Sequence, residues 1–127
     1  MKLQSWDELK KYRDDTKDET SLLSDDSKTT ILAVGEATCG IAAGAKEVAD
    51  ALQAEIEKQK LSNVKIIATG CYGCCYAEPM VEVRQPGKDS VYYGYVTPDI
   101  AKDIVSKHVA NNEILQGNVL NMEVLIP

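Results

Sequence analysis

The chain has 127 residues and a formal net charge of −6 at pH 7. This length suits one domain with a single hydrophobic core, and the negative charge argues against nucleic acid and anionic membranes, because both need a basic surface on their partner. The first residues hold no apolar run typical of a signal peptide, and no segment approaches the roughly 18 apolar residues of a membrane span, so we expect a cytoplasmic protein.

The first 28 residues predict a short helix followed by an acidic linker. Ser5 and Glu8 have the spacing of a capping box, in which each side chain accepts a hydrogen bond from the other residue's amide. We therefore expect a helix over residues 6–13. Residues 14–28 carry six acidic residues against two lysines, a net charge of −4, and have little apolar surface to bury, which predicts a mobile, solvated spacer.

Residues 29–69 predict a strand, a long helix and a second strand. Residues 29–35 are apolar and β-branched and end at a glycine, which is typical of a buried strand. Residues 40–60 change to helical spacing, with one apolar stripe made by Ala45, Val48, Ala49, Leu52 and Ile56. Residues 64–69 form the second strand, and a helical crossover of this length predicts a right-handed, parallel βαβ unit.

Residues 80–110 predict an antiparallel hairpin and a last helix. Residues 80–85 and 91–95 alternate as two strands around a turn at Pro86 and Gly87. Thr97 and Pro98 are typical of a helix start, and an apolar side follows at Ile100, Ile104, Val105, His108 and Val109. The order βαβ then ββα predicts an α/β fold over residues 29–110, with helices packed on a mixed four-stranded sheet, as in a thioredoxin-like domain. We expect the tail, residues 111–127, to lie on the domain or on a partner.

His108 and three tyrosines are assigned to packing. His108 is the only histidine and shares the apolar side of the last helix, so we interpret it as a packing or helix-end residue and not as a ligand. Tyr92, Tyr93 and Tyr95 fall on strand positions, where aromatic residues are favoured. We therefore expect the chemistry of the chain to lie in its cysteines.

The four cysteines follow the first two predicted strands. Cys39 comes after the first strand, at the start of the long helix, and Cys71, Cys74 and Cys75 come after the second strand. Adjacent parallel strands bring these loops to one end of the sheet, so all four sulfurs could converge. In a reducing cytosol, such thiols indicate a metal site, a catalytic group or inert cysteines more readily than disulfides. The helix start beside Cys39 would favour its thiolate form.

Three alternatives remain open from the cysteine pattern alone. Cys71 and Cys74 form a CxxC pair, which suggests a redox dithiol, but thioredoxins carry theirs at the start of the long helix, where this chain has only Cys39. Four thiolates also suit a structural zinc site, although the adjacent Cys74 and Cys75 make that geometry awkward. Unliganded thiols in a loop are the third interpretation.

Three motifs in order resemble those of the thioredoxin-like 2Fe-2S ferredoxins. They are TCGIAAGA over residues 38–45, TGCYGCCYAEP over residues 69–79 and YGYVTP over residues 93–98. Within that family the chain is most similar to the small HndB-type subunits of NADP-reducing hydrogenases. The resemblance covers about residues 30–115 and implies a thioredoxin-like ferredoxin fold. It also implies a cis peptide bond between Glu78 and Pro79, because this fold places a cis-proline just before its third strand.

The resemblance implies a ligand set for a 2Fe-2S cluster. Four-cysteine members use C-x4-C in the first loop and C-x3-C in the second; Cys39, Cys71 and Cys75 match the second, third and fourth ligands. The first ligand position falls on Val34, and Cys74 matches none. A substitute ligand such as Cys74, Glu36 or a group from outside the chain completes the site, or the domain is a structural adaptor without a cluster. A Val34→Cys substitution is expected to stabilise a cluster if the loops converge.

The implied function is electron transfer within a larger complex. The partners would be a flavin and iron-sulfur subunit that oxidises NAD(P)H and a hydrogenase-type catalytic subunit, with this chain as a non-catalytic carrier of a 2Fe-2S cluster. No GxGxxG follows a strand, so NAD(P) and flavin would belong to those partners. The alternative is a cluster-free structural adaptor of the same kind of complex, and a weaker one is a dithiol reductase acting through Cys71 and Cys74.

Overall fold

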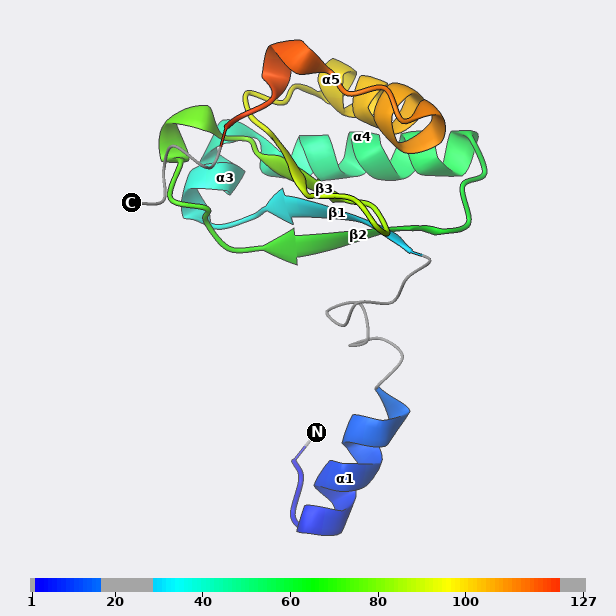
Figure 1. Ribbon diagram of the computed structural model, residues 1–127. Coiled ribbons are helices and arrows are strands. Elements are labelled where there is room, and N and C mark those ends of the chain that lie inside the picture. Colours follow the sequence, from blue (N-terminus) through cyan, green and yellow to red (C-terminus); the bar gives the residue numbers. More distant parts are fainter. Residues whose placement is uncertain (1, 17–28, 122–127) are drawn as a thin grey trace.

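A computed structural model describes residues 2–16 and 29–121 (Figure 1). Helix α1 (Trp6–Asp15) follows Ser5, whose side chain accepts from the Glu8 amide at 3.2 Å, and it ends later than predicted. The Glu8 carboxylate accepts from the Gln4 amide at 2.8 Å, one residue before the predicted partner. Most of the predicted acidic linker, residues 17–28, lies outside the described residues. No helix in the described ranges has the length and apolar character needed to cross a bilayer.

The sheet has four strands in the order β2-β1-β3-β4. β1 (Thr30–Gly35) pairs in parallel with β2 (Val64–Thr69), and β3 (Val81–Arg84) runs antiparallel to both β1 and β4 (Val91–Tyr93). The predicted βαβ unit and the predicted hairpin are therefore confirmed. β1 is buried along its whole length, whereas β2 forms a half-exposed edge.

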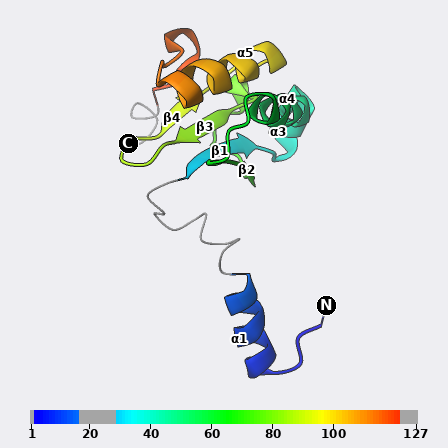
Figure 2. The ribbon, with the colours of Figure 1, turned by 90° about the vertical axis from the view of Figure 1, so that its right-hand side faces the viewer.

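Helices α4 (Ala45–Lys58) and α5 (Pro98–Asp103) cover one face of the sheet (Figures 1 and 2). The predicted apolar stripe is buried at Ala45, Val48, Leu52 and Ile56 and half-buried at Ala49. α5 continues as a π-helical segment, η3 (Ile104–Val109). The predicted α/β fold with helices packed on a mixed sheet is confirmed.

The predicted continuous helix over residues 40–60 is wrong. The segment forms two helices, α3 (Thr38–Ala43) and α4, which meet at Gly44. Gly44 has φ 101°, a left-handed conformation that glycine adopts without steric cost, and its amide closes α3 onto the Gly40 and Ile41 carbonyls. The break lets α3 turn away from α4 and cross the end of β1.

The core lies between the sheet and α4, α5 and η3. Alternate strand positions face the helices, and these include Leu32, Val34, Val81, Val83 and Tyr93, all buried. The opposite face carries a smaller buried cluster of Cys74, Ala77 and Met80, against which Tyr72, Tyr92 and Leu120 pack. The buried Glu82 also lies on this face, where Arg84 Nε donates to its Oε1 at 2.8 Å and Tyr72 Oη donates to its Oε2 at 2.9 Å.

The last strand ends before Tyr95, so the predicted strand 91–95 is too long. Tyr95 has φ 52° and is 55% exposed, whereas Tyr93 is buried. The tail lies beside this end of the strand: Val119 bridges to Tyr93, and the Gly94 amide donates to the Asn118 carbonyl at 2.9 Å. The described part of the tail, residues 111–121, therefore lies on the domain, as one of the two expectations had it.

His108 is a buried packing residue, as predicted. It is 3% exposed, and its Nδ1 lies 2.7 Å from the Tyr93 hydroxyl, which also accepts from the Leu115 amide at 3.2 Å. This buried hydrogen bond joins the imidazole to the sheet, whichever of the two atoms donates. Burial, with a smaller contribution from Lys88, lowers the pKa of His108 below its ordinary value of 6.5.

This buried histidine predicts a loss of stability in mild acid. The unfolded chain binds the His108 proton more readily than the folded protein, so the stabilisation is fully present above pH 6.5 and is lost as the pH falls below it. We expect His108→Gln, whose side-chain amide can donate to Tyr93 or accept from it, to flatten the dependence of the free energy of unfolding on pH between about 7.5 and about 5.5. Urea denaturation at several pH values in this range measures the free energy of unfolding. An equal dependence on pH in the wild type and in His108→Gln would contradict a lowered pKa of His108.

Candidate metal centre

The site lies at the carboxyl ends of β1 and β2. The register of the two strands ends with Gly35 opposite Thr69, and the Glu36 amide continues the pairing by donating to the Thr69 carbonyl at 2.9 Å. Both loops therefore leave the sheet at the same level. Cys39 lies in the first turn of α3, and Cys71 lies two positions after the end of β2.

Three of the four sulfurs lie together at this edge. Cys39 Sγ is 3.4 Å from Cys71 Sγ, and Cys71 Sγ is 3.4 Å from Cys75 Sγ, so Cys71 lies in the middle. All three sulfurs are within 4.8 Å of one another. Cys71 and Cys75 are exposed and Cys39 is half-buried. Three soft donors at this spacing form a metal-binding geometry for iron, zinc or copper(I).

A close backbone contact holds α3 against the end of β1. A Cβ atom built on Gly40 would lie 2.0 Å from the Gly35 carbonyl oxygen, far inside contact distance. Only a residue without a side chain fits, so the glycine lets Cys39 reach the loop of Cys71. Residues 35–44 are rich in glycine and alanine, and this composition is the sequence signal for the close contact between α3 and β1.

Cys71 and Cys75 differ in acidity because of the hydrogen bonds that their thiols make. The Gly73 amide donates to Cys71 Sγ at 3.2 Å, and this bond, followed by those from Cys75 and Cys39, lowers the pKa of Cys71 below its ordinary value of 9.0. Hydrogen bonding to Cys71 and then to Cys39 raises the pKa of Cys75 to about 12. Cys71 therefore ionises at a lower pH than Cys75.

Cys74 lies apart from the other three sulfurs. Its side chain is 2% exposed and packs with Ala77 and Met80 on the sheet face opposite the helices. Its sulfur lies 4.0 Å from the Tyr72 carbonyl oxygen. The expected convergence thus includes three sulfurs and not four, because adjacent residues in this loop point in different directions. The Cys71 thiol pairs with Cys39 and Cys75, so the geometry of a Cys71–Cys74 dithiol is not present.

Val34 and Glu36 do not lie with the thiols. Val34 is fully buried in the core cluster under the helices and is paired with Val81 across the sheet. Glu36 is half-exposed, and in the described residues no hydrogen bond joins its carboxylate to a cysteine. A cysteine in place of Val34 would have its thiol in the apolar core and not beside the other three sulfurs. The structure therefore gives no direct support to the expected effect of Val34→Cys.

Glu78 is a site residue that the sequence reasoning did not assign. It precedes Pro79 through a cis peptide bond, which confirms the predicted isomer. Its carboxylate is buried, with Oε1 3.9 Å from Cys39 Sγ. An acidic residue three positions after Cys75 and directly before the proline was the available signal.

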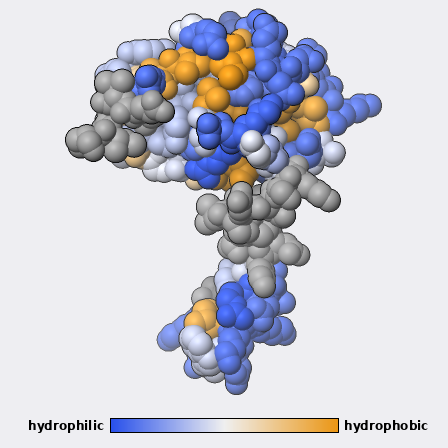
Figure 3. Space-filling model, in the orientation of Figure 1, coloured by the Kyte–Doolittle hydropathy of each residue, from blue (hydrophilic) through white to orange (hydrophobic). Residues whose placement is uncertain are grey.

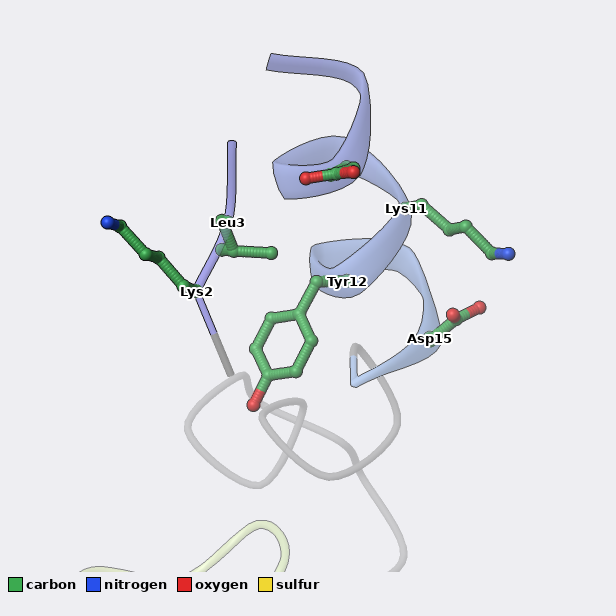
Figure 4. Close-up of a pocket in the computed structure, with 6 residues that line it drawn as sticks. Lys2, Leu3, Lys11, Tyr12 and Asp15 are labelled. Carbon is green, nitrogen blue, oxygen red and sulfur yellow. The ribbon is translucent and has the colours of Figure 1, made fainter. Parts of the chain in front are cut away.

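The surface of the described residues also has hollows that no cysteine lines. One lies on the N-terminal segment between Leu3 and Tyr12, where Lys2, Lys11 and Asp15 point outward and do not converge (Figure 4). α1 buries none of its residues, and its surface is mostly hydrophilic (Figure 3). Another hollow runs past Glu47, Tyr95 and Pro98 and reaches Glu78 and Pro79. Its titratable lining residues are Glu47, Glu78 and Tyr95, and none of its described lining residues is a cysteine.

The chain is similar to known proteins along most of its length. It is 36% identical to the NADP-reducing hydrogenase subunit HndB of Solidesulfovibrio fructosivorans over 115 residues, which cover 91% of this chain and 89% of HndB. It is also 35% identical to a 2Fe-2S ferredoxin of Clostridium pasteurianum over 71 residues, covering 55% of this chain and 67% of the ferredoxin.

Solved structures give the same relationship. The thioredoxin-like 2Fe-2S ferredoxin of Aquifex aeolicus superposes with a TM-score of 0.64 and 26% sequence identity, covering 74% of this chain and 98% of the ferredoxin. No family model matches the chain. The predicted fold and the predicted family resemblance are confirmed.

The contact between Gly40 and Gly35 predicts that alanine is not tolerated at position 40. Gly40→Ala must displace backbone, so we expect it to lower the free energy of unfolding by about 1 to 3 kcal/mol, measured by urea denaturation. Gly70→Ala is the matched control in the same region, because no atom lies within 4 Å of a Cβ built there. Equal stability of the two variants would contradict the packing of α3 on β1.

The hydrogen bonding predicts an order of thiol reactivity. The thiolate is the nucleophile, so in the reduced, metal-free protein at about neutral pH Cys71 should react with iodoacetamide faster than Cys75 does. The buried Cys74 should react last. Peptide mass spectrometry after brief alkylation gives the order, and faster labelling of Cys75 than of Cys71 would show that the Gly73 amide does not stabilise the Cys71 thiolate.

Proposed function

The chain belongs to the thioredoxin-like 2Fe-2S ferredoxin family, and we propose that it is an electron-transfer subunit of an NAD(P)-linked, hydrogenase-type oxidoreductase complex. The observation that carries the proposal is the cluster of three sulfurs at the end of β1 and β2. A bound 2Fe-2S cluster would accept and release one electron at a time, and the chain itself performs no bond chemistry.

The donor set fits an iron-sulfur cluster. Cys39, Cys71 and Cys75 would hold it, because thiolates are the usual protein ligands of such clusters and these three lie within 4.8 Å of one another. The lowered pKa of Cys71 favours the ionised form that binds metal. The Gly73 amide, which donates to Cys71 Sγ, would stay next to the cluster and stabilise negative charge on it.

The partners that we propose are other subunits of the same complex. They are a flavin and iron-sulfur subunit that oxidises NAD(P)H and a hydrogenase-type catalytic subunit, all located in the cytoplasm. The similarity to HndB, a subunit of an NADP-reducing hydrogenase, supports such an assembly. Two exposed cysteines favour exchange of electrons with a neighbouring subunit, since the site reaches the protein surface.

Cofactor content tests the proposal. We expect the anaerobically produced protein to contain iron and acid-labile sulfide in equal amounts, with the visible absorption and the reduced-state EPR signal of a 2Fe-2S cluster. Cys39→Ala, Cys71→Ala and Cys75→Ala should each lose the cluster, because each removes a thiolate donor. Cys74→Ala is the matched control and should retain iron and sulfide, since Cys74 lies outside the group of three sulfurs.

Two outcomes would contradict this function. Protein without iron and sulfide, both as isolated and after anaerobic reconstitution, would favour a structural adaptor of the complex. Stoichiometric zinc bound in preference to iron would indicate a structural metal site on the same thiols.

A further inference from the structure

We propose that Glu78 supplies the fourth donor of the cluster through its Oε1 atom, beside the thiolates of Cys39, Cys71 and Cys75. The inference depends on the proposed function, because it names a ligand of the cluster proposed above. A 2Fe-2S cluster takes four protein donors, and the three neighbouring thiols leave one position to be filled.

The Glu78 carboxylate is fixed by the backbone on one side and faces a thiol on the other. Glu78 is 8% exposed. Its Oε2 accepts from the Met80 amide at 3.0 Å, and its Oε1 lies 3.9 Å from Cys39 Sγ. The carboxylate therefore lies beside Cys39, at the end of the row of sulfurs away from Cys75, with Cys71 between the two.

Two glycines leave the space that this carboxylate occupies. A Cβ built on Gly35 would lie 3.2 Å from Glu78 Oε1, and a Cβ built on Gly40 would lie 3.3 Å from Oε2. Both distances are tighter than ordinary contacts. The end of β1 and the first turns of α3 are thus shaped to admit a carboxylate beside Cys39.

The charge of Glu78 has no protein counterpart. In the described ranges no lysine or arginine forms an ion pair with it, whereas the other buried acid, Glu82, is bound by Arg84 and Tyr72. A buried carboxylate without a positive partner is costly. Iron would supply that partner, and a carboxylate carries the same single negative charge as the thiolate that it replaces.

The other candidates for the fourth donor fit less well. Val34 lies in the core beneath the helices, and Cys74 is buried in a separate cluster with its sulfur near the Tyr72 carbonyl. Glu36 is half-exposed, and among the described residues no hydrogen bond joins its carboxylate to a cysteine, whereas Glu78 Oε1 lies 3.9 Å from Cys39 Sγ. Glu78 is the buried acid whose oxygen lies next to one of the three sulfurs.

The test reconstitutes the full chain anaerobically with iron and sulfide and measures X-ray absorption at the iron edge. We expect the wild-type cluster to show an oxygen ligand in addition to sulfur. Glu78→Cys should keep the cluster and lose the oxygen signal, because it offers a fourth thiolate. Glu78→Gln can still accept from the Met80 amide but lacks the charge, so its cluster should be lost to a chelator at least about tenfold faster than that of the wild type.

Glu36→Gln is the matched control, and we expect its chelation rate and its iron spectrum to equal those of the wild type. An all-sulfur wild-type spectrum, or an oxygen signal that persists in Glu78→Cys, would overturn the role of Glu78 and leave the cluster itself intact. Cluster assembly in Glu78→Cys but not in the wild type would also overturn ligation by the carboxylate. Absence of iron and sulfide from the wild type and from every variant would instead overturn the proposed function.

Discussion

The position of β1 between a parallel and an antiparallel neighbour determines where the site forms. β2 ends where β1 ends, with Gly35 opposite Thr69, and β3 begins there, with Val34 opposite Val81. Three chain segments therefore meet at one end of the sheet: the loop after β1, the loop after β2 and the entry to β3. This arrangement brings Cys39 to 3.4 Å from Cys71, although they are 32 positions apart, and places Glu78 beside them.

Two glycines, Gly35 and Gly40, allow these segments to lie close together because they have no side chains. Gly40 rests on the Gly35 carbonyl, so α3 approaches the sheet more closely than side chains would allow. The left-handed Gly44 then ends α3 and starts α4 in a new direction. A helix that ran straight through this segment could not both pack in the core along Val48 and Leu52 and hold Cys39 at the end of β1.

Much of the fold could be predicted because its signals are local. The apolar spacing of α4, the turn at Gly87 and the cap at Thr97 each involve residues close in sequence, and all agree with the structure. The break at Gly44 could not be predicted, since the nearby alanines favour a helix and only the contact of α3 with β1 requires the turn. The order of strands alone did not distinguish Cys74 from Cys75, because the direction of each side chain depends on the 3₁₀ turn (Cys75–Ala77) and on packing with Met80; only the C-x3-C spacing of the family left Cys74 out.

The exposure of Cys71 and Cys75 has a kinetic consequence for any cofactor held there. An electron would cross almost no protein between the iron and the surface, so tunnelling to a docked redox centre would be fast and little limited by the fold itself. The same open side admits molecular oxygen. A cluster at this position would therefore exchange electrons rapidly but would have a short lifetime in air. Protection from oxygen would have to come from a partner that covers this edge of the sheet.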